Sequence, residues 1–119
     1  MPLAGVRVFV VEDEALVLLE LEDLLADLGC TVVGSALRIE EALSMAQSVQ
    51  CDVAVLDVNV GGARIDTVAE ALAHRNIPFI FVTGYERNVL PAAFRDQPLL
   101  IKPYGKADLE QSLKMCIDR

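Results

Sequence analysis

The chain has 119 residues, of which 54% are hydrophobic and 24% charged, and its 18 acidic and 10 basic side chains give a formal net charge of −8. This length and composition are typical of one globular domain, which we expect to span residues 1–119. The acidic balance argues against binding to nucleic acid, which requires basic side chains to neutralise phosphates, and against docking on an anionic membrane.

Short apolar runs rich in β-branched residues alternate with segments of helical spacing along the sequence. The first helical segment shows the pattern, because Leu18, Leu21 and Leu25 share one face while acidic residues occupy another. In chain order we predict a strand over residues 7–12, a helix over 13–28, a strand over 31–37, a helix over 39–49, a strand over 53–57, a helix over 66–75 with Asp66 as its N-cap, a strand over 79–82, a short helix over 88–95, a strand over 99–101 and a helix over 107–117.

Five strands alternating with helices predict an α/β domain with a parallel sheet that has helices on both faces. Residues 85–98 are the least regular part, because Pro91 is compatible with a helix only near its first turn. In doubly wound folds of this class the binding crevice lies at the carboxyl ends of the strands.

Polar side chains follow or end four of the five predicted strands. Glu12 ends the first strand and Asp13 follows it, and Asp57 ends the third. Thr83 follows the fourth strand and Lys102 the fifth. Whole βα units separate these positions, so we expect the side chains to converge on one edge of the sheet.

These residue types suit phosphoryl transfer. Carboxylates close together need a cation, and oxygen ligands without His or Cys select Mg²⁺, Mn²⁺ or Ca²⁺. An Asp beside Mg²⁺, a Lys ammonium and a Thr hydroxyl can act as nucleophile and stabilisers of the phosphoryl oxygens. Gly84 has no side chain, so a phosphoryl group can approach its amide closely. Singly, Asp13 could be a helix cap, Lys102 a surface charge and Thr83-Gly84 a turn, so it is their co-occurrence that favours a functional site.

With these motifs the sequence resembles a response-regulator receiver domain of two-component signalling over essentially its whole length. The resemblance implies a flavodoxin-like sheet with strand order 2-1-3-4-5. Residues 78–85, together with Pro103-Tyr104, are similar to a subgroup of stand-alone receivers with an irregular fourth helix. The matching motifs are Glu12-Asp13 after VFVV, VAVLD ending in Asp57, Thr83-Gly84 after FIFV, and Lys102-Pro103 after LLI.

The resemblance implies a role for each residue of the acidic group. Asp57 would be the phosphoacceptor, taking a phosphoryl group from a phosphohistidine on a sensor histidine kinase or a histidine phosphotransfer protein. Asp13 would bind Mg²⁺, or Mn²⁺ in its place, directly. Glu12 would bind it partly through water, and the main-chain carbonyl of Asn59 would complete the protein ligands.

The resemblance also implies that Thr83 and Lys102 contact the phosphoryl oxygens and that the Lys102-Pro103 bond is cis. Receivers often carry an aromatic switch residue at the position of Leu99, so Tyr104 is a candidate substitute. We expect residues 83–104, including Gly84, to be the element that changes conformation. A proline that the family often has after the phosphoacceptor is missing from residues 58–62, where we expect a more pliable loop.

Ala15, Leu16 and Leu19 lie outside the main apolar stripe of the first helix, close to the acidic pair. Receivers usually meet the helical bundle of the kinase there, so these residues and Pro103 form the expected docking surface. The alternative is that this helix buries a broad face against the sheet. We expect no effector domain after residue 119, and therefore output through a downstream protein partner or through onward phosphotransfer.

Two other functions compete with this interpretation. A phosphatase or other hydrolase with an Asp nucleophile would need a second Asp two residues after Asp57, where the chain has Asn59. A protein-binding module that is not phosphorylated would not need Asp57 and Lys102. We therefore expect a regulator that catalyses only its own phosphorylation and dephosphorylation, and not an enzyme that acts on other substrates.

The sequence also bears on localisation. No stretch approaches the ~18 uninterrupted apolar residues of a membrane span, and the N-terminus lacks the basic and apolar regions of a signal peptide. Cys30, Cys51 and Cys116 are odd in number and widely spaced, which fits free thiols better than a disulfide framework. We therefore expect a cytoplasmic protein.

Overall fold

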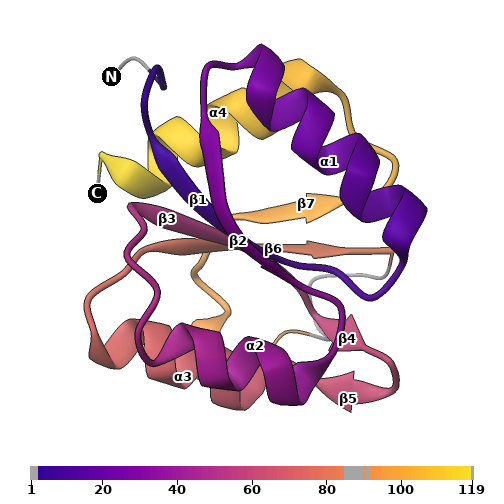
Figure 1. Ribbon diagram of the computed structural model, residues 1–119, viewed down its shortest axis with the longest axis vertical. Helices are drawn as coiled ribbons and strands as arrows, with labels where there is room; N and C mark the ends of the chain where they lie inside the picture. Colours follow the sequence, from indigo (N-terminus) through magenta and orange to yellow (C-terminus); the bar gives the residue numbers. More distant parts are fainter. Residues whose placement is uncertain (1–2, 85–89, 91, 119) are drawn as a thin grey trace.

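The computed structural model describes residues 3–84, 90 and 92–118 (Figure 1). At its centre lies a parallel sheet of five strands in the order β2-β1-β3-β6-β7, which confirms the predicted order 2-1-3-4-5. The five strands are β1 (Arg7–Val11), β2 (Thr31–Ala36), β3 (Val53–Asp57), β6 (Phe79–Thr83) and β7 (Leu99–Ile101).

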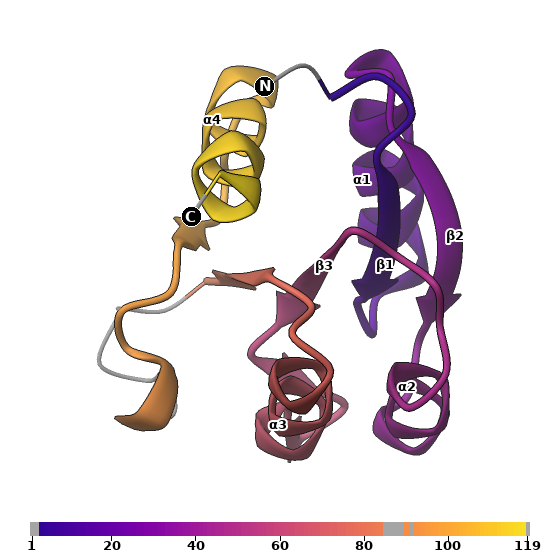
Figure 2. The same cartoon turned by 90° about the vertical axis from the view of Figure 1, so that its left-hand side faces the viewer.

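In the described part of the chain, helices cover both faces of the sheet (Figure 2). Helices α1 (Ala15–Asp27) and α4 (Lys106–Ile117) lie on one face, and α2 (Ile39–Ala46) and α3 (Asp66–His74) lie on the other. Every residue of β3 and β6 is buried, as expected for central strands of a parallel sheet covered on both sides.

Side chains alternate along each strand between two apolar cores. We call the one beneath α2 and α3 the first core; Phe9 and Phe81 belong to it. The second core, beneath α1 and α4, contains Val10 and Ile80. Because the strands are held from both sides, their carboxyl ends form a fixed edge on which polar side chains can be placed.

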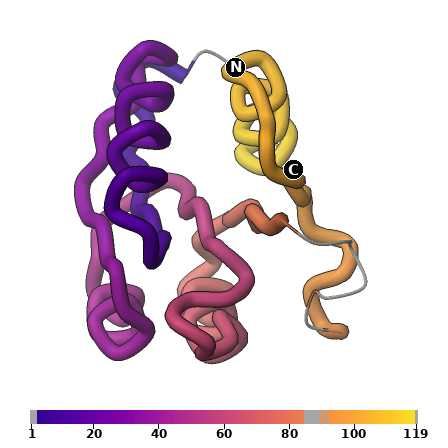
Figure 3. The backbone as a smooth tube through the Cα atoms, turned by 90° about the vertical axis from the view of Figure 1, so that its right-hand side faces the viewer, coloured from indigo at the N-terminus to yellow at the C-terminus, as the bar shows by residue number. Residues whose placement is uncertain are grey.

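The 3-10 helix η2 (Ala92–Phe94) occupies part of the region where we predicted a short helix over residues 88–95. Residues 85–89 and 91 of that region lie outside the described residues. Phe94 packs against the first core, and its ring centroid lies 5.4 Å from that of Phe79. Segment η2 therefore lies on the same side of the sheet as α2 and α3 (Figure 3).

The segment after Asp57 differs from the expected pliable loop. It forms an antiparallel hairpin of β4 (Asn59–Val60) and β5 (Ala63–Arg64). Gly61 and Gly62 make the turn with φ of +59° and +85°, and positive φ at both positions of a two-residue turn is most easily adopted by glycine.

Asp66 is not the N-cap that we predicted for the third helix. The N-cap is Ile65, and Asp66 is the first helical residue. Its Oδ1 accepts a hydrogen bond from Nε of Arg64 at 3.1 Å, so its carboxylate is used by the preceding strand and not by the helix N-H groups.

Among the described residues, no helix has both the length and the apolar character needed to span a bilayer.

Candidate functional site

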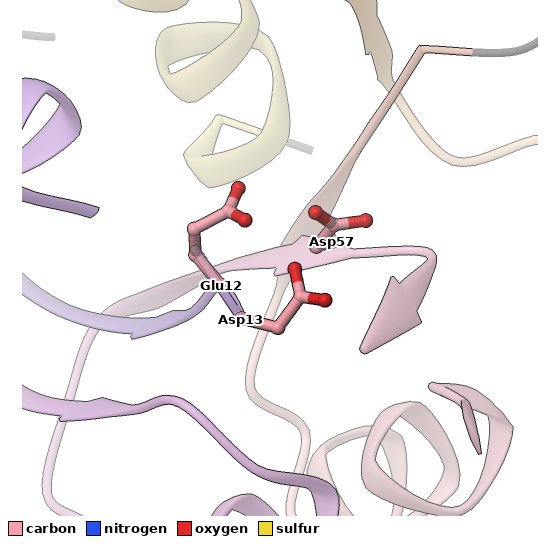
Figure 4. A group of neighbouring side chains, drawn as sticks. All are labelled: Glu12, Asp13 and Asp57. Carbon is pink, nitrogen blue, oxygen red and sulfur yellow. The ribbon is translucent and has the colours of Figure 1, made fainter. Parts of the chain in front are cut away.

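The carboxyl ends of β1 and β3 bring three acidic side chains together. The register of the two strands pairs Val11 with Leu56, so Glu12 and Asp57 come next on neighbouring strands. Asp13 follows in the loop before α1. One carboxylate oxygen from each of Glu12, Asp13 and Asp57 lies within 4.8 Å of the others, and the three groups turn toward a common space (Figure 4).

Lys102 joins this group from the end of β7. Its Nζ lies 3.0 Å from Oε1 of Glu12 and 3.2 Å from Oδ2 of Asp57. Burial lowers the pKa of Lys102, but the hydrogen bond to Glu12 and the charge of Asp57 raise it by more, so the pKa lies above its usual value. The ammonium group is thus charged at neutral pH. The Lys102-Pro103 peptide bond is cis, as the resemblance implied.

Each of the three carboxylates also accepts a hydrogen bond from a main-chain N-H. These bonds stabilise the charged forms of groups that would otherwise repel one another. The donors are Glu14 for Oε2 of Glu12 at 3.1 Å, Asn59 for Oδ1 of Asp57 at 3.1 Å and Gly61 for Oδ2 of Asp13 at 2.8 Å.

Glu12 is the most perturbed acid of the site. It is 2% exposed, and this burial raises the pKa of its carboxyl to about 7. The hydrogen bonds from Lys102 and from the N-H of Glu14 act in the opposite direction, and the charge of Asp57 raises the pKa further. The environment therefore penalises the Glu12 anion, and additional positive charge would relieve that penalty.

The donor set fits a hard divalent cation. Three carboxylates around one space, with neither His nor Cys among the clustered ligands, match the oxygen ligands of Mg²⁺ and Mn²⁺. A depression of about 510 Å³ opens beside them and leaves room for a ligand. Its lining residues are Asp13, Glu14, Asp57, Asn59, Thr83, Gly84 and Lys102.

Thr83 and Gly84 therefore line the same depression as Asp57 and Lys102, as predicted. Thr83 is buried and ends β6, whereas Gly84 is exposed. Six of the predicted site residues thus line one depression, and Glu12 accepts a hydrogen bond from Lys102 beside it. Glu14 and Gly61 could not be predicted as site residues from the sequence, because they contribute main-chain N-H groups that every residue except proline has.

Tyr104 is placed differently from the other switch candidates. It is half-buried and packs against the second core, and this burial raises the pKa of its phenol. Along β6, Phe79 and Phe81 belong to the first core, so the alternation of the strand directs Thr83 to that side. The structure thus does not bring Thr83 and Tyr104 onto one face of the sheet.

The candidate docking residues on α1 are on the surface. Ala15, Leu16 and Leu19 are exposed, Leu16 to 76% and Leu19 to 57%. The buried stripe of the helix consists of Leu18, Leu21 and Leu25. The alternative that α1 buries a broad face including Leu16 and Leu19 is therefore wrong. Pro103 is exposed as well.

Comparisons with known proteins identify proteins that are similar to this chain in sequence and fold. The family model for the response regulator receiver domain matches residues 8–114. Transcriptional regulatory protein PdtaR of Mycobacterium tuberculosis is 29% identical over 117 residues, which cover 95% of this chain and 57% of PdtaR. The chain spans about half the length of the curated relatives it matches.

Two solved structures are similar over nearly the whole chain. SdrG from Sphingomonas melonis Fr1 has a TM-score of 0.84 at 38% identity, and the match covers 98% of this chain and 99% of SdrG. The anti-anti-sigma factor PhyR from Bartonella quintana has a TM-score of 0.76 at 27% identity, with 95% of this chain and 48% of that chain covered.

Proposed function

The chain belongs to the response regulator receiver domain family, and from this premise we propose that Asp57 accepts a phosphoryl group from a phosphohistidine of a partner protein. The observation that carries the proposal is that Asp57 lies 3.2 Å from Lys102 Nζ and within 4.8 Å of carboxylate oxygens of both Glu12 and Asp13. A nucleophilic carboxylate with an ammonium and a cation site close to it meets the requirements of aspartyl phosphorylation.

In the proposed transfer, a carboxylate oxygen of Asp57 forms a bond to phosphorus while the bond from phosphorus to the imidazole nitrogen of the donor breaks. Lys102 exchanges its bond to Asp57 for one to a phosphoryl oxygen. Thr83 and the N-H of Gly84 donate to the remaining oxygens. The transfer leaves an acyl phosphate on this chain and a histidine on the partner.

The proposed cation site consists of Glu12, Asp13, Asp57 and the main-chain carbonyl of Asn59. When bound, Mg²⁺ or Mn²⁺ supplies positive charge that offsets the charge of the phosphoryl oxygens. Glu12 also accepts a hydrogen bond from Lys102, so it holds the ammonium group within hydrogen-bond distance of Asp57.

The proposal includes a sensor histidine kinase or a histidine phosphotransfer protein as phosphoryl donor and a downstream protein as output. Similarity to a PhyR described as an anti-anti-sigma factor favours output by protein contact. The net charge of −8 disfavours nucleic acid and anionic membranes as partners. Because the proposed partners are kinases or phosphotransfer proteins of two-component signalling, we propose that the chain acts in the cytoplasm.

Acetyl phosphate tests the function without the unknown kinase. We expect the wild-type chain to gain one phosphoryl group in the presence of Mg²⁺, measured by intact mass, and to lose it in alkali. Removing Mg²⁺ with EDTA should abolish the labelling. Repeated turnover of p-nitrophenyl phosphate would instead identify a hydrolase, and a chain that takes up no label would be a binding module.

We further propose that residues 83–104 change conformation on phosphorylation, with Thr83, Gly84 and Tyr104 as switch residues. The contact of Phe94 with Phe79 supports the proposal, because it connects η2 to the strand that ends at Thr83. Hydrogen exchange should show altered amide protection in this segment when beryllofluoride and Mg²⁺ are added. Unchanged protection at its described residues, with the site saturated, would contradict the switch.

We also propose that Ala15, Leu16, Leu19 and Pro103 contact the phosphoryl donor. Leu19→Glu should lower transfer from a donor that phosphorylates the wild-type chain by about tenfold or more, because a charge would be buried in an apolar contact. Labelling by acetyl phosphate should not change. Met115→Glu on α4 is a matched control, because Met115 is also 57% exposed. Equal transfer to both variants would place the docking surface elsewhere.

A further inference from the structure

The hairpin β4–β5 supplies hydrogen-bond donors to two different acids of the site. Asn59 donates its N-H to Oδ1 of Asp57 at 3.1 Å, and Gly61 donates its N-H to Oδ2 of Asp13 at 2.8 Å. Asp13 and Gly61 are 48 residues apart in sequence, so the second bond connects the loop after β1 to the turn after β3. One short segment therefore contacts both aspartates that face the proposed cation site.

The hairpin is itself held in place. Val60 is 2% exposed and Ile65 is fully buried, and both belong to the first core. The N-H of Ile65 donates to the carbonyl of Val58 at 3.2 Å, which closes the base of the hairpin. At the tip, the N-H of Gly62 donates to Oδ1 of Asn59 at 3.0 Å. The N-H of Gly61 is thus presented to Asp13 from an anchored turn.

Among the residues that the structure describes, the N-H of Gly61 is the hydrogen-bond donor to the Asp13 side chain. Asp13 is only partly buried and lies in the loop before α1, whose N-cap is Glu14 without a side-chain cap bond. Its carboxylate stands close to those of Glu12 and Asp57, so charge repulsion favours rotation of Asp13 toward solvent. The bond from Gly61 opposes that rotation.

We propose that the main-chain N-H of Gly61 is a positioning group, which holds the Asp13 carboxylate ready for a divalent cation. The inference rests on the proposed function only in taking Asp13 as a cation ligand. With Asp57 held by Asn59 and Asp13 by Gly61, the hairpin keeps the two carboxylates at a fixed separation before the cation arrives. Breaking the turn therefore weakens cation binding without removing any ligand.

Gly61→Val tests the proposal, because a β-branched residue strains a backbone with positive φ and disrupts the turn. We expect the Kd for Mg²⁺, measured by titration of amide chemical shifts, to rise about tenfold, the lower limit for loss of a group that orients a ligand. Gly61→Asn should stay within about twofold of wild type, because Asn tolerates positive φ and keeps the N-H.

Gly5→Val is the matched control for backbone strain. Gly5 also has positive φ, at +80°, and, like Gly61, has no atom within 4 Å of the position of an added Cβ. It lies near the N-terminus and bonds Gly29, away from the acidic residues. We expect this variant to bind Mg²⁺ with wild-type affinity. If Gly5→Val and Gly61→Val weakened Mg²⁺ binding equally, the cause would be general destabilisation of the fold, and the proposal would be overturned.

A second measurement examines the bond without any cation. The amide of Gly61 should exchange slowly with solvent in wild type, and Asp13→Ala should accelerate its exchange about tenfold or more while the hairpin amides of Val60 and Ile65 stay protected. Exchange at Gly61 that does not respond to Asp13→Ala would overturn the inference. Failure of acetyl phosphate to label wild type would instead overturn the proposed function, whichever way these amide and Mg²⁺ measurements turn out.

Discussion

Asp57→Asn is expected to abolish labelling of the chain by acetyl phosphate. The amide oxygen of Asn is a much poorer nucleophile than a carboxylate, so no acyl phosphate can form at this position. The substitution keeps the size of the side chain and an oxygen that can accept the N-H of Asn59, so the fold should persist. Intact mass after incubation with acetyl phosphate and Mg²⁺ should show one added phosphoryl group in wild type and none in the variant.

Asp52→Asn provides the control at the other end of the same strand. Asp52 precedes β3 and pairs with Arg7 at 3.0 Å, so its substitution also removes a carboxylate that is paired with a cation. We expect this variant to be labelled like wild type. An alkali-labile phosphoryl group on Asp57→Asn would show that another acid, Asp13 or Glu12, is the acceptor.

The central elements of the fold could be predicted because their sequence signals are local and mutually consistent. The predicted strands 53–57 and 99–101 coincide with β3 and β7. In a parallel sheet the end of each strand also fixes where the next residue lies, so the spacing of Asp57 and Lys102 was enough to predict that they meet at one edge of the sheet, where they are in contact. The order of the elements thus predicted the shared edge, and the family resemblance supplied the order of the strands in the sheet.

The remaining features depend on contacts that no local pattern specifies. A pliable loop was expected over residues 58–62, but a hairpin forms there because Val60 and Ile65 pack in the first core. Asp66 has the side chain of an N-cap, yet Arg64 takes its carboxylate. The position of Tyr104 was also undetermined, because either face of the sheet can accept an aromatic ring that follows a strand.

The elevated pKa of Glu12 makes the cation-free protein sensitive to pH. Its pKa of about 7 in the folded chain exceeds the ordinary value of 4.5, so between these pH values the folded state binds more protons than the unfolded state. The stability contributed by this group is therefore fully present below about pH 4.5 and is lost as pH rises through about 7. The free energy of unfolding, measured with urea in the presence of EDTA, should show this decrease as pH rises. Glu12→Gln should remove the part of the decrease that is due to the Glu12 carboxyl.

Lys102→Met should lower the rate of labelling by acetyl phosphate roughly 100-fold, because one preorganised donor to the phosphoryl oxygens is lost. The same substitution removes the hydrogen bond that lowers the pKa of Glu12, so the pKa of that carboxyl should rise further above its ordinary value. In EDTA, the loss of stability with rising pH should then extend to higher pH than in wild type.

The double effect of Lys102→Met separates this residue from an ordinary surface lysine. Lys106→Met removes the same charge from an exposed residue at the start of α4 and should change neither the labelling rate nor the pH profile of unfolding. If Lys102→Met slowed labelling but left the pH profile unchanged, the ammonium would act on the phosphoryl group alone and Glu12 would be held by other groups. If the substitution changed the pH profile of unfolding but not the rate of labelling, Lys102 would have no part in the transfer. Its bonds to Glu12 and Asp57 would then serve only the stability of the fold.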